Sequence, residues 1–98
     1  MYYWISYDIE NNSTRTKLAK NLEKFGAIRV QKSIFIADAT LKTWQDILDS
    51  LSKVVLDKKA IDNIILISLE EHQLQLSTCL GKNEALDNLK NPPKIIFF

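Results

Sequence analysis

Asp8 is the side chain whose type and position most clearly suggest chemistry, because it is a carboxylate at the end of an aromatic and β-branched run. Such a run is typical of a half-buried strand, so we expect the first nine residues to form a strand with Tyr3, Ile5 and Tyr7 on one face. Asp8 would then lie where the strand leaves the sheet, a position at which α/β folds often carry functional groups. The alternative is that Asp8 only starts a turn or caps a helix, as Asp commonly does.

Three lysines form the second chemically suggestive pattern. Apolar residues at i, i+4 and i+7 from Leu18 predict an amphipathic helix that begins after the polar loop at residues 10–13 and ends at Gly26. The lysines are spaced i, i+3 and i+7 on this helix and form one stripe away from its apolar face: Lys17, Lys20 and Lys24. The stripe could follow a phosphate backbone, although a solvated helix face is the more common explanation of exposed lysines.

The basic residues are concentrated in the first third of the chain. Residues 1–37 hold six Lys or Arg against three Asp or Glu, whereas residues 38–71 hold four against seven. The formal net charge of +1 therefore conceals a positive region. With 98 residues, the chain is long enough for one domain with one modest core.

Composition excludes several kinds of site. Cys79 is the one cysteine, so no disulfide can form within the chain, and we expect a reducing compartment. His72 is the one histidine and has no Cys or second His at ligand spacing, which excludes a structural zinc site in one chain. No apolar run approaches the ~18 residues of a membrane span, and the first residues do not have the pattern of a secretion signal. We therefore expect a cytoplasmic protein without membrane contact.

Residues 27–38 alternate between apolar and polar types and contain no Gly or Pro. This pattern predicts either one long bent strand or two short strands joined sharply. In an unbroken strand, the polar residues would face one way together with one aromatic ring: Arg29, Gln31, Ser33 and Phe35. The other apolar side chains would face the core: Ile28, Val30, Ile34 and Ile36.

The second half of the chain predicts a helix, a strand and a hairpin. A 3.6-residue apolar period predicts a helix over residues 40–56, with Asp49 and Lys53 paired at i,i+4 on a solubilising surface. The apolar run within residues 61–69 predicts a buried strand. The next three residues could form the turn of a hairpin that returns toward Gly81.

The C-terminus combines a polar stretch with an apolar end. Residues 82–91 are polar and precede two prolines, which together would make a stiff spacer. The last four residues are large and apolar: Ile95, Ile96, Phe97 and Phe98. Because such an end would promote aggregation if exposed, we expect it to form a strand that docks on the partner in a homodimer. The expected organisation is a domain over residues 1–81 and a docking extension over residues 82–98.

The predicted order of elements is strand, helix, strand, strand, helix, strand. This order gives an α+β fold, a ferredoxin-like βαββαβ sandwich with additional C-terminal strands. Within it, the motif Tyr7-Asp8-Ile9 is followed by Arg15 and Leu18 and then by Phe25-Gly26-Ala27-Ile28-Arg29-Val30-Gln31-Lys32-Ser33-Ile34-Phe35. In letters and in spacing, this pattern resembles the CRISPR-associated protein 2 family.

The resemblance implies a small homodimer that acts in the acquisition of CRISPR spacers and bridges copies of the CRISPR-associated protein 1 integrase. Several members of the family are described as metal-dependent nucleases on RNA or double-stranded DNA, so the resemblance also implies an endonuclease that uses Mg²⁺ or another divalent cation. The family's metal-binding and catalytic acid falls on Asp8. The family's supporting strand positions fall on Arg29, Gln31, Ser33 and Phe35. Tyr7 of the motif is a further supporting residue.

One carboxylate per chain is a poor Mg²⁺ site, because Mg²⁺ usually takes one or two carboxylates together with phosphate oxygens and waters. A two-fold axis near Asp8 would bring two copies together, and a shared cation could polarise a phosphate and activate a water. The expected nucleic-acid contacts are the basic residues of the first third: Arg15, Lys17, Lys20, Lys24, Arg29 and Lys32. Two alternatives remain open, a structural DNA-binding adaptor without catalysis and a nuclease toxin of similar fold.

Overall fold

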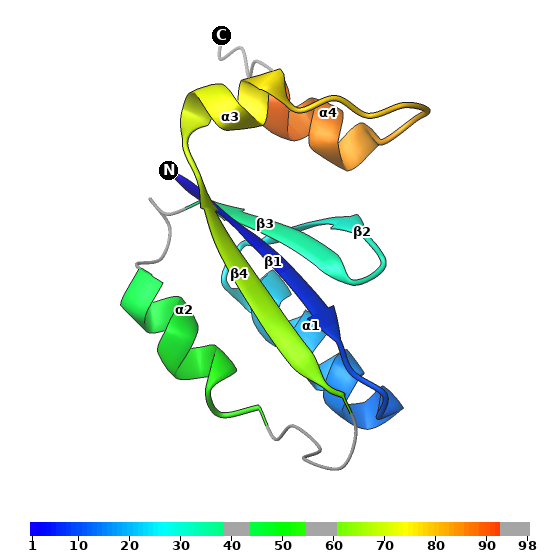
Figure 1. Ribbon diagram of the computed structural model, residues 1–98, viewed down its shortest axis with the longest axis vertical. Helices are drawn as coiled ribbons and strands as arrows, with labels where there is room; N and C mark the ends of the chain where they lie inside the picture. The colour runs from blue at the N-terminus through cyan, green and yellow to red at the C-terminus, as the bar shows by residue number, and fades with distance from the viewer. Residues whose placement is uncertain (39–43, 55–60, 93–98) are drawn as a thin grey trace, which may run out of the picture.

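The computed structural model describes residues 1–38, 44–54 and 61–92. This part of the chain forms the following elements: β1 (Tyr2–Asp8), α1 (Asn12–Lys24), β2 (Ile28–Gln31), β3 (Ile34–Asp38), α2 (Trp44–Leu51), β4 (Asn63–Leu69), α3 (Glu71–Leu76) and α4 (Glu84–Lys90). The strands form one antiparallel sheet in the order β2-β3-β1-β4 (Figure 1). This arrangement confirms the predicted α+β class and the βαββαβ core.

The core lies between one face of the sheet and helices α1 and α2. Its most deeply buried side chains come from four elements: Ile5 of β1, Leu18 and Leu22 of α1, Phe35 of β3 and Ile47 of α2. Tyr3 and Tyr7 are buried beside Ile5, so the predicted alternation of β1 is confirmed. Packing on both helices holds β1 at the centre of the sheet, which fixes the position of its C-terminal end.

Helix α1 is closed by Gly26 as the sequence predicts, but it begins at Asn12, inside the predicted loop over residues 10–13. The Asn11 side chain accepts a hydrogen bond from the Thr14 N–H at 2.9 Å, which satisfies one of the free N–H groups of the first turn. Gly26 follows the helix with a φ of 80°, a left-handed conformation that glycine adopts without strain. The chain can therefore turn directly from α1 into β2.

Residues 27–38 form two strands rather than one. A turn at residues 32–33 separates β2 from β3, and the pairing of these strands shifts register between Arg29 and Gln31. Such an irregularity places an extra residue in one strand and changes which of its side chains face the core. A simple alternation therefore does not extend through this segment.

The predicted orientation of Phe35 is wrong, because its ring faces the core. Phe35 pairs with Ile5 of β1, and residues that pair directly across antiparallel strands share a face of the sheet. The Phe35 ring is fully buried, whereas Ile28, a predicted core residue, is 41% exposed. Ile36 is buried as predicted, but it lies on the face of the sheet away from α1.

Residues 70–92 form an arm of two short helices, which we call the C-terminal arm, and the predicted hairpin after β4 is wrong. Glu70 and Gln73 form a capping box in which the Glu70 N–H donates to the Gln73 Oε1 at 2.7 Å, so this segment starts helix α3 instead of a turn. The predicted polar spacer also contains a helix, α4. Asn83 caps its first turn by accepting the Leu86 N–H at 2.9 Å.

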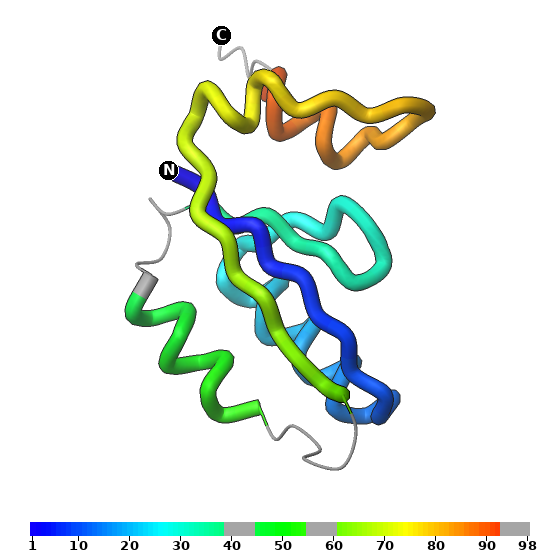
Figure 2. Tube along the Cα trace, viewed as in Figure 1, coloured from blue at the N-terminus to red at the C-terminus, as the bar shows by residue number. Residues whose placement is uncertain are grey.

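The C-terminal arm crosses one end of the sheet, on the face away from α1 (Figures 1 and 2). Its Leu74 is buried, and Leu74 and Leu86 line one hollow together with Ile36 of β3. The side-chain amide of Asn83 donates to the Val30 carbonyl at 2.5 Å, which ties the arm to β2. The arm thus covers part of this face and leaves the C-terminal end of β1 uncovered (Figure 1).

Further hydrogen bonds make the C-terminal arm one unit and connect it to β1. The Gln75 side-chain amide donates to the Lys90 carbonyl at 2.9 Å, and Lys90 Nζ donates to the Ser77 carbonyl at 2.6 Å. At the start of β1, burial and then a side-chain hydrogen bond with Glu71 raise the pKa of Tyr2 above its ordinary value. The two helices of the arm are therefore fixed to each other and to the sheet.

Some predictions lie at or beyond the limits of the described residues. Helix α2 falls within the predicted helix over residues 40–56, whose two ends are outside the described ranges. The predicted terminal strand over residues 95–98 also lies outside them. Every helix in the described ranges is too short or too polar to cross a bilayer.

Candidate nucleic-acid interface

A basic cleft lies between α1 and the β2–β3 hairpin, on the helix side of the sheet. Its volume is about 320 Å³, and its lining comes from β1, α1, β2 and the β2–β3 turn: Tyr7, Arg15, Thr16, Ala19, Lys20, Glu23, Arg29 and Lys32. Four of these side chains are cationic and one is a carboxylate, so the lining has a net positive charge. Four of the six predicted basic contacts therefore meet at one place.

Arg15 is held in the basic cleft by two hydrogen bonds. One guanidinium nitrogen donates to the Ile9 carbonyl at 3.1 Å, and the other donates to the side-chain oxygen of Asn12. A guanidinium has five N–H donors, so these contacts leave donors for an anion. The position of Arg15 is thus set before any ligand binds.

Arg29 lies over a buried aromatic stack. Its guanidinium carbon is 5.0 Å from the centroid of the Phe35 ring, and this ring stacks on Tyr7 with the centroids 6.3 Å apart. A cation above a ring face is attracted by the ring quadrupole, so the position of the exposed guanidinium is restrained. The Tyr7 hydroxyl also donates to the Lys32 carbonyl at 3.4 Å, which ties the turn that carries Lys32 to β1.

The other predicted contact and supporting residues lie outside the basic cleft. Lys17 and Lys24 are exposed on α1, but neither lines the cleft. Gln31 lines the hollow beneath the C-terminal arm. Ser33 contributes its backbone carbonyl, which accepts the Tyr7 N–H at 3.1 Å and helps to fix the β2–β3 turn. One of the three lysines in the predicted stripe therefore faces the cleft.

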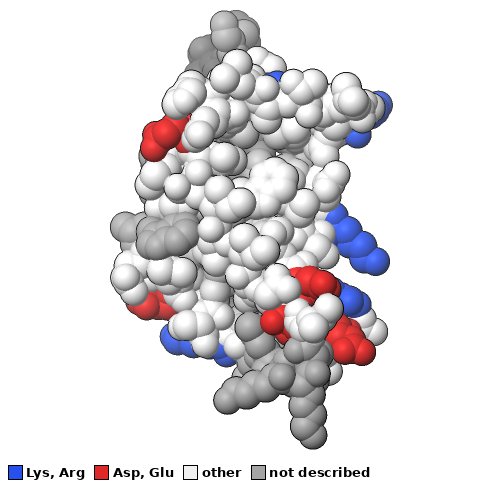
Figure 3. Space-filling view, viewed as in Figure 1, with Lys and Arg blue, Asp and Glu red and all other residues white. Residues whose placement is uncertain are grey.

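Asp8 is exposed at the tip of β1, on the face of the sheet away from the basic cleft. It pairs with Asn63 of β4, while Tyr7 beside it in the chain points into the core. The face that carries Asp8 also carries Ile65 and Ile67, which are 52% and 51% exposed. Figure 3 shows a broad uncharged area on this side of the molecule. The structure thus places Asp8 beside an open apolar surface and not in the cleft.

The donor set of a single chain does not fit a Mg²⁺ site. Within residues 1–38, 44–54 and 61–92, no three side chains of His, Cys, Asp or Glu come together as metal ligands. Asp8 alone supplies one carboxylate, whereas Mg²⁺ needs further oxygen ligands. A metal site at Asp8 would therefore require donors from a second chain or from a substrate.

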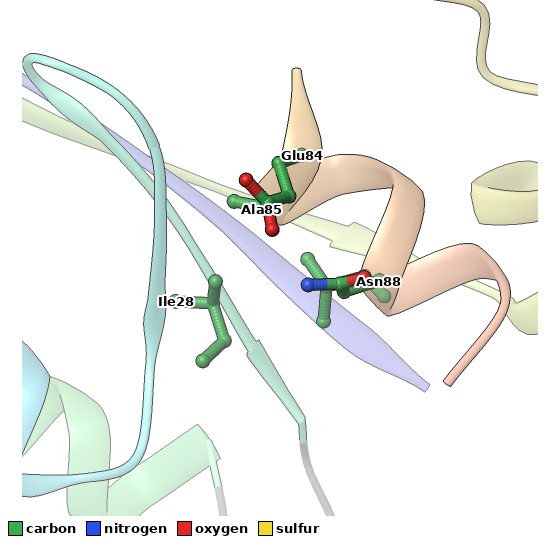
Figure 4. A pocket seen from close by; sticks show the side chains of 5 residues that line it. Ile28, Glu84, Ala85 and Asn88 are labelled. Carbon is green, nitrogen blue, oxygen red and sulfur yellow. The ribbon is translucent and has the colours of Figure 1, made fainter. Parts of the chain in front are cut away.

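Two further hollows differ in their chemistry. The first, of about 480 Å³, lies between β2 and α4, where Ile28 lies across from Ala85 and Asn88 (Figure 4). No described residue of its lining is a cation. The second, of about 230 Å³, lies between α1 and the end of α2 and has this lining: Thr14, Lys17, Asn21, Lys53 and Val54. Lys53 was not predicted as a phosphate contact, because its spacing from Asp49 matches a surface ion pair.

Comparison with known proteins agrees with this architecture. The family model described as CRISPR associated protein Cas2 matches residues 1–76. A protein of Francisella tularensis subsp. novicida named CRISPR-associated endoribonuclease Cas2 1 is 37% identical over 78 residues, which cover 76% of each chain. A protein of Pyrobaculum aerophilum named CRISPR-associated endoribonuclease Cas2 2 is 28% identical over 78 residues, which cover 68% of this chain and 86% of that relative.

A third relative shows the same similarity over a shorter range. A protein of Chloroflexus aurantiacus named CRISPR-associated endoribonuclease Cas2 1 is 37% identical over 59 residues, which cover 60% of this chain and 62% of that relative. The family model spans all four strands of the sheet and both helices of the core. On this basis, the chain belongs to the CRISPR associated protein Cas2 family.

Proposed function

We propose that this Cas2-family protein is a CRISPR-associated endonuclease that binds the phosphate backbone of nucleic acid in its basic cleft. The observation that carries the proposal is the convergence of four cationic side chains from α1, β2 and the β2–β3 turn on one cleft. The names of its relatives, CRISPR-associated endoribonucleases, support RNA as a substrate. Because the contacts would be to phosphates, binding should depend little on base sequence and strongly on salt.

The four cationic side chains of the cleft would contact the phosphate backbone in two different ways. Arg15 and Arg29 would each present two parallel N–H donors to a pair of phosphate oxygens. Lys20 and Lys32 would act as point charges beside them. Since Arg15 is already hydrogen-bonded and Arg29 already stacked, both would lose little conformational freedom on binding.

We also propose that two copies pack through the open sheet face that carries Asp8. Ile65 and Ile67 are half exposed there, and burying a large apolar side chain fully stabilises an assembly by about 1.5–3 kcal/mol. A two-fold axis through this face that passes near Asp8 would bring the two Asp8 carboxylates together, and the pair would be a donor set of the kind that Mg²⁺ takes. The chemistry available at such a shared site would be polarisation of a phosphate and activation of a water.

A structural adaptor is the second candidate function. The separation of Asp8 from the basic cleft favours it, because an adaptor needs the cleft and not the carboxylate. In this role, the homodimer would bind duplex DNA and bridge the CRISPR-associated protein 1 integrase during spacer acquisition. The predicted terminal strand over residues 95–98, which would dock on the second copy, stays a prediction.

Replacing Lys20 and Arg29 together by Ala should weaken binding and flatten its salt dependence. On single-stranded RNA, the slope of log affinity against log salt should fall by up to about 1.4, because each phosphate contact contributes about 0.7. Fluorescence anisotropy with a short labelled RNA over a salt series measures this slope. Lys82→Ala, which removes one positive charge, is the control for charge loss outside the cleft, because Lys82 is exposed in the C-terminal arm and does not line the cleft. If the double variant has the same salt slope as the control, the cleft is not part of the nucleic-acid interface.

Replacing Ile65 and Ile67 together by Glu should convert the proposed dimer into monomer. Four carboxylates would be brought onto the apolar face in each dimer, and burying unpaired charge opposes association strongly. Analytical ultracentrifugation measures the effect at a concentration where the wild-type protein sediments as a dimer. Ile61→Glu is the control, since Ile61 is 85% exposed and lies before β4. A double variant that remains a dimer would show that the two copies pack through another surface.

A further inference from the structure

A second basic site lies across α1 from the basic cleft. We call it the basic hollow, the space of about 230 Å³ between α1 and the end of α2. It takes Lys17 from α1 and Lys53 from the residues after α2, so its two cations come from separate parts of the chain. At 100° per residue, the α1 residues that line the hollow lie on a different flank of the helix from those that line the cleft. Helix α1 is therefore a ridge with cations on both sides.

The two lysines of the basic hollow are not neutralised by neighbouring acids in the described ranges. Asp49, the predicted ion-pair partner of Lys53, accepts a hydrogen bond from the Gln45 side-chain amide at 2.8 Å and does not line the hollow. Among the residues that the structure describes, the lining of the hollow contains two lysines and no carboxylate. Its neutral polar residues, Thr14 and Asn21, can donate hydrogen bonds from their side chains. Two ammonium groups with a hydroxyl and an amide form a suitable environment for a phosphate.

We propose that the basic hollow binds phosphates of the second strand of a duplex DNA whose first strand lies in the basic cleft. This inference rests on the proposed function, because it needs the cleft to bind a backbone. An α-helix with its side chains is about 10–12 Å across, and the major groove of B-form DNA is about 12 Å wide. Helix α1 would thus lie along the groove, with one backbone on each of its flanks.

This geometry distinguishes duplex DNA from the other nucleic acids. A duplex RNA has a deep and narrow major groove that an α-helix does not enter. A single strand has one backbone and would therefore occupy the cleft without the hollow. The exposed face of α1 is formed by Thr16, Lys17 and Lys20 among other polar residues, so it would meet the groove without burying apolar surface. In this arrangement Lys53 contacts a DNA phosphate, a role that no sequence motif indicates.

The test compares salt slopes of binding on a DNA duplex and on one of its single strands. The double variant with Lys17→Ala and Lys53→Ala should lower the slope on the duplex by up to about 1.8, since each duplex contact contributes about 0.9, and should leave the single-strand slope near that of wild type. The variant with Lys20→Ala and Arg29→Ala should lower both slopes. Lys82→Ala again controls for the loss of charge.

The outcomes separate this inference from the proposed function. The inference is supported if the Lys17/Lys53 variant has a lower salt slope than wild type on the duplex and the wild-type slope on the single strand. A duplex slope equal to that of the Lys82 control would overturn it, and so would an equal loss on duplex and single strand, because the hollow would then serve any backbone. If the Lys20/Arg29 variant matches the control on both ligands, the proposed function fails, and the inference fails with it.

Discussion

Phe35→Ala should lower the free energy of unfolding by about 3–5 kcal/mol, the usual range for removing a buried aromatic ring. The Phe35 ring is fully buried and pairs with Ile5, so its loss would leave a cavity between the sheet and α1. The ring also stacks on Tyr7 and lies under Arg29, so two further contacts would be lost with it. A small domain has only about 5–15 kcal/mol of stability in total, and the variant should be close to unfolding at 37 °C.

Chemical denaturation at one fixed protein concentration measures this change, because dimerisation would make stability depend on concentration. Ile61→Ala is the matched control, since it removes an apolar side chain that is 85% exposed. The control should change stability by less than about 0.5 kcal/mol. If Phe35→Ala changed the free energy of unfolding as little as the control does, the ring would not be part of the core. The Phe35 ring would then not hold Arg29 in position.

Asp8→Asn should reduce phosphodiester cleavage by about a hundredfold or more and leave nucleic-acid binding intact. Loss of a positioned catalytic group typically lowers the rate by about 10²–10⁴-fold. Asn is nearly isosteric with Asp, and Asp8 is exposed at the tip of β1, so the fold should not change. Cleavage of labelled RNA and duplex DNA, with Mg²⁺ or with a chelator, gives the rates.

Glu10→Gln is the control for this substitution, because Glu10 is a second exposed carboxylate two residues after Asp8. It should retain the wild-type cleavage rate. If Asp8→Asn cleaved as fast as wild type, the activity would come from another group or from a contaminant, and the adaptor function would be favoured. If both variants lost activity equally, the general negative charge at this end of the sheet would be responsible and not a specific site.

The first strand and first helix were predictable because local pattern and tertiary environment agree there. The alternation of Tyr3, Ile5 and Tyr7 matches a strand with one face on the core, and Asn11 and Gly26 mark the ends of α1. Each of these signals depends on neighbours in the sequence. The order of the elements was sufficient to predict the βαββαβ core.

Predictions failed where tertiary contacts decide the structure. Arg29 and Phe35 pair directly and share a face as alternation predicts, but the pairing of Phe35 with Ile5 of β1 makes this face the core face. The register shift between Arg29 and Gln31 instead places Gln31 on the opposite face, beside Ile36. The C-terminal arm was predicted as a hairpin and a spacer. Its short helices depend on caps at Glu70 and Asn83 and on packing against the sheet, neither of which produces a long apolar period.

The candidate site was predicted in its residue types but not in its arrangement. Arg15, Lys20 and Arg29 were expected to bind phosphate, and they line one cleft. Their separation from Asp8 could not be predicted, because it follows from which face of the sheet α1 covers. The position of Lys53 beside α1 likewise depends on the packing of α2, since the two lysines of the basic hollow are 36 positions apart in the sequence.

In the proposed function, the basic cleft binds nucleic acid, and Asp8 acts in cleavage without holding the ligand. The most direct test is the affinity for a short RNA, measured in chelator so that no cleavage occurs, for wild type, Asp8→Asn and the Lys20→Ala, Arg29→Ala variant. We predict that Asp8→Asn binds at least as tightly as wild type, because it loses a negative charge, and that the double variant binds more weakly with a flatter salt slope. Weakened binding in Asp8→Asn together with unchanged binding in the double variant would show that Asp8 holds the nucleic acid and that the basic cleft does not.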